Sequence, residues 1–345
     1  MAIVSHSAEE IQGLFADNSV ITTQIFIIPK ALSGLHIFVV ELTGDIGWSL
    51  WNKNRQTLYI GISEMAFEDA YTLPIHETAK LLELFWWPPD RKHPKTIGYV
   101  QKAMPHFLPI ATSGNGPLTP NQLAIYDILA HEIAHYWNRT YDSNTGVYAG
   151  ADSEKADPNA PSVYKCPKPC DSLTAGTFPA ISWTDYVPEP ADFDPPWSPA
   201  GIWGYSIVDA TVRLQGTLTT STPHLPDDGG IQVWPSATVT DFLNDLYGGG
   251  LSNPFPTAQA VTSPLEDFAE SYTMFALYRV GLRSLCLLMP NNTATPPTND
   301  VMFTLFRNGA PFRAKVDSLT GIATGLNGGY GITVPTDYPS NSGCP

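Results

Sequence analysis

The sequence predicts an α+β fold, with a sheet near the N-terminus and helices towards the C-terminus. Segments rich in β-branched and aromatic residues gather in the first 62 residues, whereas the two clearest helical segments lie beyond residue 119. No internal repeat interrupts this order. The 345 residues, 43% of them apolar, are enough to bury a large core.

β-Branched and aromatic side chains dominate three runs early in the chain. Strands are therefore predicted at residues 20–28, 34–42 and 56–62. Short helices are expected at 8–16 and 77–85. The segment 110–118 is rich in Gly, Pro, Ser and Thr, so it is predicted to be a loop.

The clearest helix is predicted at residues 120–138. Thr119 can cap its first turn, and Pro120 suits the first helical position, where a missing N–H costs nothing. Apolar residues then recur at helical spacing. They are Leu123, Tyr126, Leu129, Ala130, Ile133 and Trp137.

A last helix is predicted from Pro264 to Tyr278. Before it, residues 141–256 are dominated by Pro, Gly, Asp, Ser and aromatics, which predicts a loop-rich insertion. We therefore expect one integrated domain in three parts. These are the sheet and helix of residues 1–140, the insertion 141–256 and a helical part at 257–345.

The helix at 120–138 carries the HExxH motif His131-Glu132-Ile133-Ala134-His135. Residues four apart lie on one face of a helix, so the two imidazoles can bind one metal ion. Zinc (Zn²⁺) is the ion that this pair predicts, and it lowers the pKa of water towards ~7. Glu132 is offset from the two histidines, which makes it the candidate general base.

Catalytic zinc needs a third protein ligand. Glycine at 138 and histidine at 141 would supply one, but Asn138 and Tyr141 stand there. The best source is Glu266-Asp-Phe-Ala-Glu270, because its two glutamates share a helix face. Other candidates for the third ligand are Glu189, Asp241, Asp245 and Asp267.

HExxH followed by Glu-x-x-x-Glu resembles the gluzincin zinc metallopeptidases, and Glu-Asp-Phe-Ala-Glu is similar to a segment of anthrax lethal factor-like peptidases. The resemblance covers these two helices, and the segment 136–265 between them is longer than usual. It implies a zincin-like fold, with a twisted N-terminal sheet and an active-site helix. It also implies that Glu266 is the third zinc ligand and that Glu270 orients a ligating histidine.

Two roles near Glu266 stay open: the use of its own carboxylate and the identity of the oxyanion donor. Ser263 and Glu266 also form a capping box, so a helix cap competes for the Glu266 carboxylate. Lethal factor-like enzymes use a tyrosine seven residues before the ligand glutamate to stabilise the oxyanion, where this chain has Gln259. The glutamine amide can donate that hydrogen bond, or a tyrosine can replace it. The candidate tyrosines are Tyr247, Tyr272 and Tyr330.

The formal net charge of −15 disfavours nucleic acid and anionic membrane surfaces as partners, because both would repel the protein. No apolar run approaches the ~20 residues of a membrane-spanning helix. We therefore expect neither a nucleic acid nor a membrane as partner.

Four cysteines, an even number, can form two disulfides and favour an oxidising compartment. They are Cys166, Cys170, Cys286 and Cys344. The first residues lack the basic start and apolar run of a signal peptide. We expect a secreted or extracellular protein, with an intracellular location as the alternative.

These observations predict a zinc-dependent endopeptidase that acts on protein or peptide substrates. One alternative is a hydrolase or biosynthetic enzyme of the same fold that acts on a small amide or ester. Another is a non-catalytic binding module with a structural zinc. Glu132 argues against the binding module, because a closed structural site has no use for a general base.

Overall fold

The computed structural model describes residues 3–4, 34–40, 46–52, 57–85, 110–114, 118–145, 178, 181, 255–257, 259–262, 264–288, 298–307, 309–310 and 312–326. These residues form a small mixed sheet, a second antiparallel sheet and several helices. The predicted helix 8–16 and strand 20–28 lie outside them, as does nearly all of the insertion 141–256. The α+β, zincin-like class and the three-part division of the chain stay predictions.

The first sheet has four strands in the order β1-β2-β4-β3. They are β1 (Ile3–Val4), β2 (Gly34–Val40), β3 (Gly47–Asn52) and β4 (Thr57–Ser63). β2 runs parallel to β4, whereas β1 and β3 are antiparallel to their neighbours. The strands predicted at 34–42 and 56–62 agree with β2 and β4 to within two residues.

One face of this sheet packs on the long helix α5 (Pro120–Thr145). Alternate residues of β4 point to that face and are buried; they are Leu58, Ile60 and Ile62. Gly47 of β3 is the register partner of Ile62, and a Cβ built on Gly47 would come within 2.7 Å of Ile128 Cγ2. Glycine at this position therefore allows strand and helix to approach closely.

Helix α5 begins with the predicted cap at Thr119. Thr119 Oγ1 accepts a hydrogen bond from Gln122 N at 3.2 Å, and Gln122 Oε1 accepts one from Thr119 N at 2.9 Å. This is a capping box, with glutamine in the third position. The Asn121 side chain donates to the backbone carbonyls of Ala66, Glu68 and Tyr71, which ties the start of the helix to the segment between β4 and α3.

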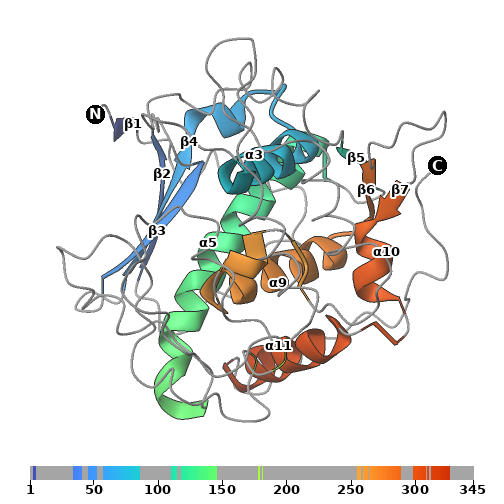
Figure 1. The fold of residues 1–345 in the computed structure, drawn as a ribbon. Helices are drawn as coiled ribbons and strands as arrows, with labels where there is room; N and C mark the ends of the chain where they lie inside the picture. Colours follow the sequence, from blue (N-terminus) through green and yellow to red (C-terminus); the bar gives the residue numbers. More distant parts are fainter. Residues whose placement is uncertain are drawn as a thin grey trace, which may run out of the picture.

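The apolar stripe expected on α5 is buried at every position whose side chain is described. These positions are Leu123, Tyr126, Leu129, Ala130 and Ile133. The helix lies between the first sheet and helix α9 (Pro264–Arg279), and α3 (Leu73–Phe85) crosses near its start (Figure 1). Because α9, α3 and the first sheet cover α5, its polar residues Asp127, His131 and Glu132 are also buried.

The second sheet is antiparallel and has the order β5-β6-β7. Its strands are β5 (Ile110–Gly114), β6 (Leu282–Leu288) and β7 (Thr298–Asp300). The loop predicted at 110–118 is therefore wrong for its first five residues. Pairing with β6 supplies hydrogen-bond partners to the backbone of a segment whose composition is typical of a loop.

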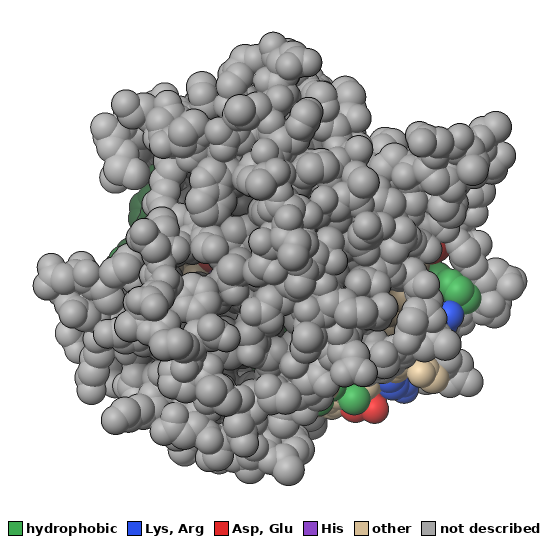
Figure 2. Space-filling view, in the orientation of Figure 1, with side chains coloured by type: hydrophobic (Ala, Val, Ile, Leu, Met, Phe, Trp, Pro, Cys, Tyr) green, Lys and Arg blue, Asp and Glu red, His purple; other side chains and the backbone are tan. Residues whose placement is uncertain are grey.

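Two helices, α10 (Val301–Phe306) and α11 (Phe312–Leu326), complete the described part. Charged side chains of both signs reach the surface at the lower right of Figure 2. On α11, Arg313 and Asp317 form an ion pair at 3.3 Å. Cys286 on β6 is disulfide-bonded, and the other three cysteines lie outside the described residues. Among the helices described, none combines the length and apolar character needed to cross a membrane.

A buried lysine joins α11 to α9. Lys315 is 0% exposed and its ammonium pairs with the Asp267 carboxylate, which is also fully buried. The rings of Phe178 and Phe255 lie 5.4 and 4.7 Å from the Lys315 Nζ. Burial lowers the pKa of Lys315 to about 8, although Asp267 opposes the shift.

We predict that Lys315→Met destabilises the protein by about 3–5 kcal/mol, because Asp267 would remain as an uncompensated buried charge. Urea unfolding at about pH 7 measures this loss. The double variant Lys315→Met/Asp267→Leu should recover much of it, since no buried charge is then left alone. A double variant as unstable as the single one would contradict this account.

Candidate metal centre

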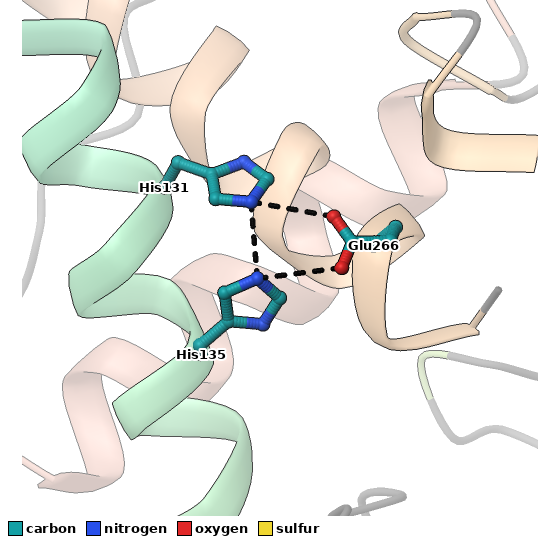
Figure 3. A group of neighbouring side chains, drawn as sticks. All are labelled: His131, His135 and Glu266. Carbon is teal, nitrogen blue, oxygen red and sulfur yellow. Dashed lines mark hydrogen bonds and ion pairs between the residues drawn. The ribbon is translucent and has the colours of Figure 1, made fainter. Parts of the chain in front are cut away.

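Three side chains that are distant in sequence converge between α5 and α9. His131 and His135 lie one turn apart on α5, and Glu266 lies in the first turn of α9. Figure 3 shows the three side chains pointing towards one another from the two helices. One ligand atom from each lies within 4.8 Å of the other two. The structure thus brings together the three residues that the sequence nominated as metal ligands.

The separations within this group would allow the three side chains to hold one metal ion. The two Nε2 atoms of His131 and His135 are 3.0 Å apart, and they lie 3.3 and 3.5 Å from the Glu266 carboxylate oxygens. Ligand atoms that bind zinc at about 2.0–2.1 Å in a tetrahedron lie about 3.3 Å from each other. Two imidazoles and one carboxylate are also a ligand set typical of catalytic zinc.

The far side of the His131 ring is held by Glu270. Its Oε1 lies 2.7 Å from His131 Nδ1, and the Glu270 side chain is 0% exposed. An ionised carboxylate only accepts hydrogen bonds, so His131 Nδ1 carries a proton, and in the neutral imidazole Nε2 would then present its lone pair. Glu270 therefore lies where the resemblance places it.

The two carboxylates also change how His131 binds protons. Burial lowers the pKa of His131, but hydrogen bonds and charges from Glu266 and Glu270 outweigh burial and raise that pKa well above its ordinary value. The pKa of Glu270 is shifted in the opposite direction. Burial raises its pKa, yet Lys80 and His131 together hold it below the ordinary value.

Glu132, the proposed general base, is buried beside the first sheet. A Cβ built on Gly47 of β3 would come 3.1 Å from Glu132 Oε1. β3 is at the edge of the four-stranded sheet that the described residues form, and it is antiparallel to its neighbour. The carboxylate of Glu132 thus lies against the face of the edge strand β3, at Gly47.

Gln259 lies next to the group, in the short helix η5 (Gln259–Thr262). Its amide Nε2 donates a hydrogen bond to Glu266 Oε2 at 3.2 Å. From the sequence, Gln259 is a candidate donor to an oxyanion. In the structure, its amide instead contacts the Glu266 carboxylate and can orient it. The oxyanion role of Gln259 stays a prediction.

The remaining candidates divide between described and undescribed residues. Asp267 pairs with Lys315 and accepts a hydrogen bond from Ser271, so its carboxylate serves the α9–α11 contact instead of a metal. Tyr272 is buried, and burial raises its pKa while Arg279 opposes the shift. Five further candidates lie outside the described residues. They are Glu189, Asp241, Asp245, Tyr247 and Tyr330.

A network of buried charges behind Glu270 was not predicted. The Lys80 Nζ lies 2.7 Å from Asp127 Oδ2, 3.1 Å from Glu77 Oε1 and 3.2 Å from Glu270 Oε1. Asp127 Oδ2 also contacts His76 Nε2 at 2.9 Å. The available signal was Asp127, a charged residue inside the apolar stretch of α5 and one turn before His131.

Comparison of the chain with protein-family models, curated proteins and solved structures gave no match. The resemblance to gluzincin peptidases therefore rests on residues 131–135 and 266–270 alone. The geometry of the metal-ligand group is independent of that resemblance, because it follows from distances between atoms.

We predict that zinc affinity falls as pH falls, by about tenfold per pH unit for each proton displaced. The sign follows from the raised pKa of His131, since a proton bound there must leave before a metal can bind. Competition with a chromophoric chelator between about pH 6 and about pH 8 measures the affinity. An affinity that is constant over this range would contradict the prediction.

A second pH effect concerns Glu77. Burial raises its pKa from 4.5 to about 8, although Lys80 opposes the shift. The folded state thus holds this proton more tightly than the unfolded state, and the resulting stability is complete below about pH 4.5 and is lost as pH rises towards about 8. We expect Glu77→Gln to flatten this decline, as measured by urea unfolding. Glu64→Gln, at an exposed glutamate, should leave it unchanged.

Proposed function

We propose that the protein is a zinc-dependent endopeptidase. The observation that carries the proposal is the convergence of His131, His135 and Glu266 at separations suited to zinc, with Glu132 between the two histidines. A closed structural site normally has four protein ligands, whereas a catalytic site has three and leaves one position for water or substrate. The described residues supply three.

The proposed chemistry divides among named side chains. His131, His135 and Glu266 would hold zinc, which when bound supplies Lewis acidity and lowers the pKa of water. Glu132 accepts the proton of the attacking water and then donates it to the amine that leaves. Glu270 keeps the His131 ring in the tautomer that presents Nε2.

The position of β3 supports an extended peptide as substrate. An edge strand offers unpaired backbone N–H and C=O groups, and a peptide can pair with them as an added strand. β3 approaches Glu132 through Gly47, so a peptide held along β3 would lie close to the general base. Hydrolysis of a small amide or ester is the competing function, and a non-catalytic zinc module is the other. A peptide assay distinguishes both from the proposal.

The disulfide at Cys286 supports a secreted or extracellular location for this activity, because such bonds persist in oxidising compartments. The net charge of −15 supports protein or peptide substrates over nucleic acid.

We predict that Glu132→Gln lowers the rate of peptide cleavage by about 10²–10⁴-fold, because the amide cannot take a proton from water. Zinc binding should stay close to that of the wild type, since Glu132 is not a member of the ligand group. Cleavage of a diverse peptide mixture, read by mass spectrometry, measures activity, and metal analysis measures zinc.

Two controls accompany this experiment. Glu68→Gln, at an exposed glutamate, should cleave like the wild type, and chelator treatment should abolish cleavage until zinc is restored. Zinc-loaded wild type that cuts none of the peptides would contradict the endopeptidase proposal and favour a small amide or ester substrate. Glu132→Gln that cuts at the wild-type rate would remove Glu132 from the mechanism.

A further inference from the structure

Lys80 links helix α3 to α5 and α9, the two helices that carry the metal-ligand group. It lies on α3 and is 8% exposed. Its ammonium contacts Glu77 on its own helix, Asp127 on α5 and Glu270 on α9, all within 3.2 Å. All three carboxylates are buried as well. The Lys80 ammonium therefore lies among carboxyl groups from three helices.

Glu270 is shared between Lys80 and His131. Its Oε1 lies 2.7 Å from His131 Nδ1, while the Lys80 Nζ lies 3.2 and 3.3 Å from its two oxygens. With contacts on both sides, the carboxylate cannot rotate or shift without loss of a charged hydrogen bond. The direction of the His131 ring is thus coupled to the position of Lys80.

The Lys80 ammonium is itself held in place. Asp127 Oδ2 binds it at 2.7 Å and also contacts His76 Nε2, and His76 Nδ1 contacts the Tyr71 hydroxyl at 2.9 Å. Tyr71 and Asp127 are 0% exposed. The chain of contacts thus extends from α3 through α5 to the back of the ligand group.

Loss of the Lys80 charge would leave Asp127 and Glu270 as buried carboxylates without the cation between them. Like charges in a low-dielectric interior repel each other strongly. Glu270 would then move away from Asp127 or release His131. Either change alters the direction of the His131 Nε2 atom.

We propose that Lys80 is a positioning residue for the metal centre: it fixes Glu270, and through Glu270 it aims His131 Nε2 at the metal. The inference rests on the metal site of the proposed function but not on the identity of the substrate. A purely structural lysine would stabilise the fold without changing metal binding, so the two roles differ in a measurable way.

The test uses Lys80→Met in the full-length chain, because methionine keeps much of the side-chain volume without charge or donors. Zinc dissociation constants come from competition with a chromophoric chelator. We expect a loss of affinity of about 10–100-fold, the range typical for groups behind a metal ligand. The visible spectrum of the Co²⁺-loaded protein should also change, because it reports ligand geometry.

The matched control is Leu305→Ala. Leu305 is buried on α10, which packs on β6, β7 and α11, so its truncation costs stability away from the metal-ligand group. It should leave zinc affinity and the Co²⁺ spectrum as in the wild type. If Lys80→Met yields no folded protein, Lys80→Gln replaces it, since the amide keeps a donor but not the charge.

Wild-type zinc affinity and Co²⁺ spectrum in the Lys80 variant would overturn the inference and make Lys80 structural. Zinc binding by the wild type without peptide cleavage would overturn the proposed function, yet the affinity comparison would still decide the role of Lys80. A wild type that binds neither metal would overturn both.

Discussion

The contact between α5 and α9 is the interaction on which the rest of the described structure depends. Asp127, His131 and His135 follow one another at four-residue steps on α5, and Glu266 and Glu270 do so on α9, so each helix turns a polar stripe to the other. Burial of such stripes is costly unless every charge has a partner. Lys80 supplies a partner to both helices, because it pairs with Asp127 of α5 and Glu270 of α9.

Helix α9 is held by two lysines that come from other helices. Glu270 contacts Lys80 of α3, and Asp267 contacts Lys315 of α11. These two carboxylates lie three positions apart, and they use separate cations from segments distant in sequence. Glu266, at the start of the same helix, is thereby placed by contacts that do not involve Glu266 itself. A ligand carboxylate carried on a helix anchored in this way has little freedom to turn from the histidines.

The contacts around the ligands bear on how the proposed enzyme departs from the family that it resembles. Where lethal factor-like peptidases have a tyrosine, this chain has Gln259, and its amide donates to Glu266. One N–H of that amide is used by this contact, and the second can still donate elsewhere. Two of the three tyrosines proposed as alternative oxyanion donors lie outside the described residues.

Features that depend on local spacing could be predicted from the amino-acid sequence. The cap at Thr119, the start of α5, the pairing of His131 with His135 on one face and that of Glu266 with Glu270 all follow from residues within a few turns of each other, whereas α5 runs seven residues beyond its predicted end at 138, to Thr145. Which elements meet was decided only by tertiary structure. β5 became a strand because β6 lies beside it, and Asp267 turned to Lys315 instead of a metal. The contacts of Lys80 could not be predicted, because they join segments that are distant in sequence and such contacts produce no periodic pattern of residues.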